Sequence, residues 1–568
     1  MTTTPAIDSI NALLQEYRRK ISNPRDLGTS FEKLIKRYLE LDPLHQSRFK
    51  NVWMWREWPL MWGPDCGIDL IAEDFDGEFT AIQCKFYLPE YQIQKKDIDS
   101  FFTESGKTFK VDGKRTSFIQ RIIVSTSDNW SEPAEKALEG QTINVIRIHV
   151  RDLEQSPIDW SKFSFEKPEK LVLKAKKTVR PHQQEAITEI LKGFKSGDRG
   201  KLIMACGTGK TYTALKLAEH VAQKNGVVLF LVPSISLMSQ TLREWTAESE
   251  KPFHAFAVCS DSKIGKDNED ISKHDLAIPA STDTTSLLKG IERLKKDKNM
   301  VVIFSTYQSI DVVSKAQKKG LPEFDLIICD EAHRATGVTL AGKEESHFVK
   351  VHDQKCIKGK KRLYMTATPR IFGDAAKTKA DEAGAVLCSM DDETLFGPEF
   401  HRLGFGKAVG ENLLTDYKVL VLAVDESIID PKFQKSFANE DKELPLEDIA
   451  KIIGCWNGLS KRFVGEEAIV EDANPMTRAV AFNRTIKDSK HIAAVFQNVV
   501  QEYIKKNPAS DAILRCELAH VDGTFNVLMR NAKLDWLKED APENTCRILT
   551  NARCLAEGVD VPALDAVL

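Results

Sequence analysis

The chain lacks the marks of a secreted, zinc-clustered or membrane-embedded protein. Its eleven cysteines are scattered singly, with no pair at two-residue spacing, which argues against both zinc sites and a disulfide framework. No apolar run approaches ~18 residues, and the N-terminus has neither the charged start nor the apolar core of a signal peptide. Internal repeats and low-complexity segments are also missing. We therefore expect a cytoplasmic protein.

An excess of charge of either sign is missing too. Lysine and arginine number 80 against 83 aspartates and glutamates, which leaves a net charge of −3. This balance gives no overall attraction to nucleic acid, so any DNA contact must come from local basic surfaces. The 568 residues, 42 % of them hydrophobic, correspond to about three to four domains on the usual prior of ~150 residues each.

The strongest motif is at residues 204–211, which read Met-Ala-Cys-Gly-Thr-Gly-Lys-Thr. Its small residues let backbone N–H groups converge on phosphates, and the helix that follows adds its positive N-terminal end. In such a loop the lysine contacts the β and γ phosphates and the final hydroxyl holds Mg²⁺. The residues expected to hold ATP and its Mg²⁺ are Gly207, Thr208, Gly209, Lys210 and Thr211. The strict pattern has glycine at position 204, where this chain has methionine, a departure frequent in nucleic-acid-dependent motor ATPases.

Two adjacent carboxylates, Asp330 and Glu331, follow directly on an apolar run that begins at Phe324. This places them at the carboxyl end of a buried strand, where ligands of open α/β sheets bind. We expect Asp330 to engage Mg²⁺ and Glu331 to activate the attacking water. Together with the phosphate loop, the pair predicts ATP hydrolysis.

Apolar segments without alternation predict a parallel sheet covered on both faces. A second unit starts near residue 406 and contains two further strands. The predicted strands of the two units are 201–204, 227–232, 301–304, 326–329, 362–365, 478–482 and 545–550.

From about Arg180 onward, these motifs and their order resemble the superfamily 2 helicases and translocases. The resemblance implies that Arg180 and Gln183 read adenine and that His333, which completes an Asp-Glu-Ala-His motif, lies at the nucleotide. It further implies that residues 232–240 and 305–308 grip a nucleic-acid backbone. Residues 366–369 would relay hydrolysis to movement.

In the second lobe, residues 481–485 and 550–562 resemble the fourth and fifth motifs of that family. The fifth motif implies that Gly558 and Asp560 contribute to the nucleotide site. The sixth motif, which supplies arginines to the γ-phosphate, would follow beyond Leu568. We therefore expect a fragment that binds ATP but turns it over on the order of 10³-fold or more slowly, since Arg553 is not placed to substitute.

In the N-terminal segment, residues 67–72 and 79–87 predict two strands joined by a turn at 76–77. Folding this hairpin puts Asp69 opposite Gln83 or Lys85, with Cα atoms about 5 Å apart. Gln83 and Lys85 are two residues apart and share one face. A carboxylate, an amide oxygen and a lysine that converge there form a Mg²⁺ site for phosphodiester hydrolysis. The alternative is an ordinary exposed hairpin.

This arrangement resembles the PD-(D/E)XK nucleases, specifically the Mrr-like branch. The resemblance implies that Asp69 and Gln83 bind metal and that Lys85 positions or deprotonates the attacking water. Glu32, in the helical pattern 29–39, matches that branch's helix-borne acid, with a merely solvated glutamate as the alternative. Nearby tryptophans at positions 53, 55, 58 and 62 are expected to pack rather than stack on bases.

These features predict an α/β protein made of a restriction-endonuclease-like domain (1–165), a charged linker (166–178) and two RecA-like lobes (179–405 and 406–568), the second incomplete. Such a chain resembles the R subunits of type I restriction enzymes and, more closely, the single-chain type ISP enzymes. The resemblance implies double-stranded DNA as partner, ATP and Mg²⁺ as cofactors, and a methyltransferase with a target-recognition region after the motor. Two alternatives remain, namely a standalone helicase-nuclease and a DNA-binding ATP switch with a non-catalytic docking module.

Overall fold

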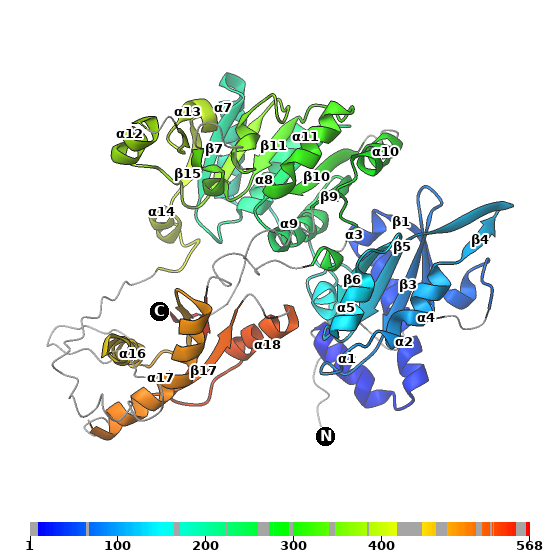
Figure 1. The fold of residues 1–568 in the computed structure, drawn as a ribbon, viewed down its shortest axis with the longest axis horizontal. Helices are drawn as coiled ribbons and strands as arrows, with labels where there is room; N and C mark the ends of the chain where they lie inside the picture. Colours follow the sequence, from blue (N-terminus) through cyan, green and yellow to red (C-terminus); the bar gives the residue numbers. More distant parts are fainter. Residues whose placement is uncertain are drawn as a thin grey trace. The chain divides into compact units, whose positions relative to one another are not determined.

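The computed structural model separates the chain into two compact units, drawn in Figure 1. The first unit comprises Met1–Ser262 with Ile271–Thr415, and the second comprises Lys263–Asp270 with Asp416–Leu568. The structure describes residues 9–63, 67–163, 171–222, 224–259, 272–276, 278–294, 299–339, 347–382, 385–416, 446–461, 474–506, 514–522, 525, 527–552 and 564–568. Within these residues, no helix is long and apolar enough to cross a membrane.

The N-terminal part of the first unit is built on a mixed six-stranded sheet. Its order is β1-β2-β3-β5-β4, and β6 also pairs with β5. Strands β1 to β3 form an antiparallel meander, whereas β3, β5 and β6 run parallel. The strands are β1 (Phe49–Met54), β2 (Leu70–Asp74), β3 (Phe79–Lys85), β4 (Thr108–Val111), β5 (Lys114–Ser125) and β6 (Asn144–His149).

Helices pack on this sheet through two hydrophobic cores. One core joins α1 and α2 to the sheet through residues such as Phe31, Leu34 and Ile82. The other is rich in aromatic side chains and includes Trp58 and Phe118 together with residues of α4. The helices are α1 (Ile10–Lys20), α2 (Pro24–Leu41), α3 (Pro43–Gln46), α4 (Lys96–Ser105), α5 (Glu132–Leu138) and α6 (Val150–Glu154).

The remainder of the first unit is a parallel seven-stranded sheet in the order β15-β7-β13-β11-β8-β10-β9. Its strands are β7 (Arg199–Met204), β8 (Val227–Val232), β9 (Phe253–Val258), β10 (Met300–Thr306), β11 (Leu326–Cys329), β13 (Arg362–Thr366) and β15 (Glu399–Leu403). Its longer helices are α7 (Pro181–Ser196), α8 (Lys210–Val221), α9 (Ile235–Glu248), α10 (Thr284–Leu294), α11 (Ile310–Lys318) and α12 (Asp374–Glu382). Short elements are β12 (Gly337–Thr339), β14 (Val386–Cys388), α13 (Glu393–Phe396) and α14 (Phe405–Gly410).

The described part of the second unit holds a parallel four-stranded sheet in the order β17-β18-β16-β19. The helices and strands of this unit are α16 (Leu446–Leu459), β16 (Arg478–Phe482), α17 (Ile486–Lys506), β17 (Arg515–Val521), α18 (Val527–Lys538), β18 (Thr545–Asn551) and β19 (Ala566–Val567).

The predicted fold class is confirmed. Each apolar segment that predicted a buried parallel strand is one, because both faces of these sheets are covered and no alternation is needed. Trp55 and Trp58 are 3 % and 2 % exposed, and Trp62 packs against Trp55 and Phe109. These three tryptophans therefore pack in the aromatic core of the domain.

Within the first unit, the N-terminal domain and the first lobe share a buried cluster of charges. Asp275, in the lobe, accepts hydrogen bonds from Arg147 Nε at 2.7 Å and lies 2.9 Å from His149 Nε2. Burial disfavours the charged imidazole, but Asp128 and Asp275 raise the pKa of His149 well above its usual value. Nearby, Arg243 of α9 donates to Asp152. The two parts are thus joined by ion pairs out of contact with solvent.

Replacement of Asp275 with alanine is expected to destabilise the first unit by about 3 kcal/mol, because it removes the shared partner of two buried cations. Unfolding in urea measures this change. Asp311→Ala is the matched control, since Asp311 is 40 % exposed and pairs with Lys350 at the surface, where an ion pair is worth about 1 kcal/mol or less. Equal shifts for the two variants would contradict the importance of the buried cluster.

Candidate nuclease and ATP sites

The register of β2 and β3 brings the N-terminal candidate residues together. Leu70 pairs with Ile82, so Asp69 is opposite Gln83, one of the two predicted alternatives. The Asp69 carboxylate accepts a hydrogen bond from the backbone N–H of Cys84 at 2.7 Å. This bond fixes the carboxylate at the point where the two strands begin to separate.

The amide of Gln83 is oriented by the loop before β2. Gln83 is 1 % exposed, and its Nε2 donates to the carbonyl oxygen of Gly67 at 3.0 Å. Its Oε1 is buried and has no hydrogen-bond partner in the part of the chain that the structure describes. A buried acceptor without a donor is costly, and a cation beside it would satisfy it.

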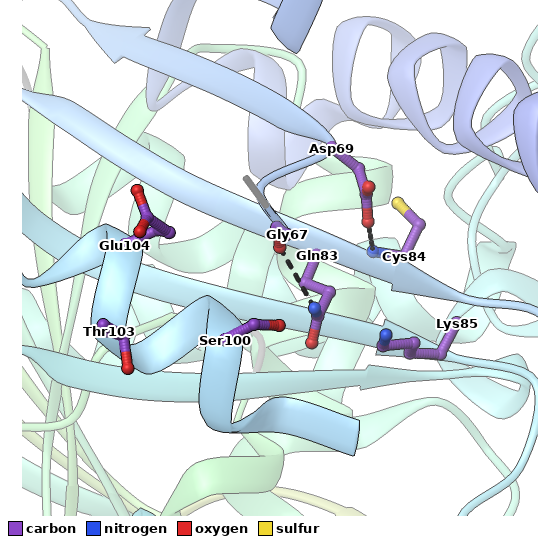
Figure 2. A pocket seen from close by; sticks show the side chains of 8 residues that line it. All are labelled: Gly67, Asp69, Gln83, Cys84, Lys85, Ser100, Thr103 and Glu104. Carbon is purple, nitrogen blue, oxygen red and sulfur yellow. Dashed lines mark hydrogen bonds between the residues drawn. The ribbon is translucent and has the colours of Figure 1, made fainter. Parts of the chain in front are cut away.

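These residues line an open cavity of about 600 Å³. Figure 2 shows Asp69, Gln83 and Lys85 around it, with Ser100, Thr103 and Glu104 of α4 on the opposite wall. Their spacing at positions 100, 103 and 104 puts them on one face of the helix. The sequence analysis missed this wall, although the helical spacing was a readable signal.

The charges of the site act on Cys84. Burial raises the pKa of its thiol, and the negative charges of Asp69 and Glu32 raise it further, against the effect of Lys85. Glu32 of α2 therefore lies close enough to act electrostatically on this end of β3, although it does not line the cavity. The cavity thus joins the carboxylates of Asp69 and Glu104 with the amide of Gln83 and the ammonium group of Lys85, and Glu32 lies outside its lining.

The phosphate loop lies between β7 and α8, as its motif predicts. Gly207 and Gly209 have φ of 80° and 86°, in the left-handed region that favours glycine. A Cβ atom at Gly209 would come within 2.3 Å of Gln183 Nε2. Lys210 Nζ donates to the carbonyl oxygen of Met204 at 3.2 Å. Thr211 is in the first turn of α8.

The start of α7 contacts this loop. Gln183 Oε1 accepts a hydrogen bond from the backbone N–H of Arg180 at 2.9 Å, and its Nε2 donates to Thr208 at 3.4 Å. His182 Nε2 is 3.0 Å from the same carbonyl oxygen. Both polar atoms of the Gln183 amide are thus engaged with backbone, and adenine contact by Gln183 and Arg180 stays a prediction.

Asp330 and Glu331 follow β11, at the carboxyl end of a central strand. Asp330 is 6 % exposed, and its Oδ1 accepts from the backbone N–H of Glu331 at 3.0 Å. Glu331 has φ of 46°, a conformation that costs on the order of 1–3 kcal/mol outside glycine and is concentrated at functional sites. Burial tends to raise the pKa of Glu331, but His333 and the charge of Lys210 outweigh it and lower this pKa.

His333 connects this motif to β13. Its Nδ1 lies 3.4 Å from Glu331 Oε2 and 3.0 Å from Thr366 Oγ1. Thr366 Oγ1 in turn accepts from the backbone N–H of Thr368 at 3.1 Å. A contiguous path of contacts thus runs from the acidic pair to residues 366–369. Gly558 and Asp560 of the predicted fifth motif lie outside the described residues.

Comparison with known proteins matches two segments of the chain to families. Residues 40–170 match the restriction endonuclease family, and residues 176–371 match the type III restriction enzyme res subunit family. The structure of the type ISP restriction-modification enzyme LlaBIII bound to DNA aligns with 98 % of this chain at 41 % identity and a TM-score of 0.83. The chain has the helicase-nuclease architecture of type ISP restriction enzymes.

Other relatives match the chain at lower identity. A probable helicase, A859L, of African swine fever virus (isolate Pig/Kenya/KEN-50/1950) is 26 % identical over 68 % of the chain and 37 % of its own length. The type I restriction enzyme EcoAI endonuclease subunit of Escherichia coli is 22 % identical over 58 % of the chain and 35 % of its own length. The chain covers 35 % of LlaBIII and thus spans about a third of the length of these relatives.

Proposed function

We propose that the chain couples Mg²⁺-dependent cleavage of double-stranded DNA to ATP-driven translocation, as the nuclease and motor part of a cytoplasmic restriction-modification enzyme. The observation that carries the proposal is the cavity lined by Asp69, Gln83 and Lys85, in which the amide oxygen of Gln83 has no hydrogen-bond partner among the described residues. The helicase and nuclease families imply ATP and, typically, a divalent metal. A methyltransferase and a target-recognition region would belong to the same enzyme.

The residues of the cavity fit a hard cation. Asp69 and Gln83 offer a carboxylate and an amide oxygen, the ligand types that Mg²⁺ accepts, while most of its shell remains water. When bound, the metal supplies Lewis-acid stabilisation of the charge that develops on the phosphate. Glu32 completes the acidic surroundings from α2.

In the nuclease site, Lys85 would position the attacking water, and the pairing of β2 with β3 would hold the metal ligands in place. The Lys85 ammonium would hold the attacking water by hydrogen bonding and stabilise the negative phosphate beside it. The bond from the Cys84 backbone keeps Asp69 in place without a moving side chain. Ser100, on the wall formed by α4, adds a hydroxyl donor that can contact a phosphate oxygen.

In the motor, Lys210 would neutralise the β and γ phosphates, and Thr211 and Asp330 would hold the Mg²⁺ that accompanies ATP. Glu331, with its lowered pKa, is ionised at neutral pH and can accept the proton of the attacking water. The path through His333 to Thr366 supports a relay from hydrolysis to movement. Translocation would bring the nuclease to its cleavage position.

Substitution of Gln83 tests the nuclease assignment. Gln83→Ala is expected to reduce plasmid nicking in Mg²⁺ and ATP by about 10- to 100-fold, because one metal-facing oxygen is lost. Gln83→Glu is expected to retain cleavage, since a carboxylate oxygen replaces the amide oxygen. The control is Gln92→Ala, at an exposed position before α4. Nicking by Gln83→Ala at the rate of the unmodified chain would overturn the assignment.

A further inference from the structure

A two-stranded ribbon, β4 and the first residues of β5, forms an edge of the N-terminal sheet (Figure 1). Its turn is Asp112-Gly113, with φ of 47° and 79°. Two-residue turns with both φ values positive match the natural twist of paired strands. The pairing runs without interruption from Thr108 opposite Ser117 to Val111 opposite Lys114. The ribbon, defined as residues 107–117, is therefore a regular hairpin rather than a loose loop.

One face of the hairpin anchors it to the aromatic core. Phe109 is 8 % exposed and Phe118 is 1 % exposed. Their rings lie 4.9 Å apart, and Phe109 also contacts Trp58 at 5.1 Å between ring centroids. The base of the ribbon is thus held firmly, and its tip extends beyond the anchor.

The opposite face carries only polar and basic side chains within the ribbon. Thr108, Lys110, Arg115 and Ser117 alternate with the buried residues and are all exposed. Lysine, arginine, serine and threonine are the side chains that most often contact phosphate oxygens of nucleic acids. Asp112, at the turn, is the single acidic residue between positions 107 and 117.

The arrangement of the basic residues destabilises the hairpin in the protein without DNA. Lys110 is directly opposite Arg115, and like charges in cross-strand positions destabilise a hairpin. Among the described residues, neither forms an ion pair with an acidic side chain, although Arg115 Nε donates to Thr108 Oγ1 at 2.8 Å. A polyanion along this face would reverse the sign of that interaction.

The ribbon is connected to the candidate nuclease site at both of its ends. Lys107, at its start, forms an ion pair with Glu104 of the cavity wall. At the other end, β5 continues to Ile123, which pairs with Gln83. At ~3.3 Å per residue, Arg115 and Ile123 are about 26 Å apart along the strand, the length of about eight nucleotides of one DNA strand.

We infer that the exposed face of residues 107–117 binds the phosphate backbone of duplex DNA about eight base pairs from the cleavage point. This inference rests on the proposed function, because that function makes DNA the substrate of the adjacent cavity. The contacts are to phosphates and carry no sequence preference. The ribbon thus holds the duplex while the cavity acts on one of its strands.

The test measures the affinity of the complete chain for DNA as a function of salt concentration, without ATP or divalent metal. The probe is a duplex of about 40 base pairs of arbitrary sequence, which is longer than the distance between the ribbon and the cavity. The variant Lys110→Gln with Arg115→Gln is expected to lower the slope of log K against log salt by about 1.8, so that its affinity falls about twelvefold less than that of the unmodified chain over a fourfold rise in salt. The control variant, Lys136→Gln with Lys162→Gln, should keep the original slope.

A second variant separates binding from folding. Lys110→Glu places a carboxylate opposite Arg115, so the thermal midpoint should stay equal or rise while DNA binding weakens. An unchanged slope in the double variant, or unchanged binding by Lys110→Glu, would overturn the inference. Asp69→Asn should keep the salt slope of DNA binding in this assay and lose nicking. The nicking assay therefore tests the nuclease assignment, and the salt slope tests DNA binding by the ribbon.

Discussion

Lys210→Ala is expected to reduce ATP hydrolysis in the presence of duplex DNA by about 10²- to 10³-fold or more, because it removes the charge proposed to neutralise the β and γ phosphates. The fold should survive, since Lys210 contacts only its own loop, at the carbonyl oxygen of Met204 and Sγ of Cys206 among the described residues, and is not part of the hydrophobic core. Phosphate release with and without DNA measures the effect. Binding of a fluorescent ATP analogue gives a second readout that does not depend on turnover.

The matched control for this variant is Lys192→Ala, on the exposed face of α7 in the same lobe. It should leave both readouts unchanged. Hydrolysis by Lys210→Ala at the rate of the unmodified chain would refute the assignment of residues 204–211 as a phosphate loop.

Asp69→Ala is expected to abolish nicking of plasmid DNA in Mg²⁺ and ATP, a loss of about 10²-fold or more, because the carboxylate that faces the cavity is removed. Alanine also removes the acceptor for the Cys84 backbone N–H. Asp69→Asn keeps an oxygen at that position and removes the negative charge, and so separates the structural role from the chemical one. Both variants should lose cleavage, while their DNA-stimulated hydrolysis of ATP stays intact.

A matched control is Asp99→Ala, in the exposed first turn of α4. Nicking should be unchanged there. If Asp69→Asn cut DNA as fast as the unmodified chain, the metal-binding role of this residue would be excluded, and the N-terminal domain would be better described as a docking module.

Much of the fold could be predicted because its signals are local. The glycines of the phosphate loop are required by positive φ, and the apolar strands need no alternation since both faces of their sheet are buried. The length of one turn narrowed the partner of Asp69 to Gln83 or Lys85, and the register of the structure selects Gln83. These features are determined by residues close together in the sequence, and can therefore be predicted from it.

Other features depend on packing between distant segments. The spacing of Ser100, Thr103 and Glu104 shows that they share one face of a helix, but it does not indicate which strands that face covers, so the cavity wall from α4 was missed. β15, which pairs in parallel with β7 at the edge of the lobe, was also missed, since Glu399 and Arg402 interrupt its apolar pattern.

The buried ion pairs of Asp275 with Arg147 and His149 have a geometric consequence. The nuclease cavity and the phosphate loop belong to one compact unit. On the proposed function, a nuclease fixed in this way would move together with the first lobe. The cut would then fall at a constant distance from the point where that lobe stops on the duplex. The structure of the first unit would set this distance.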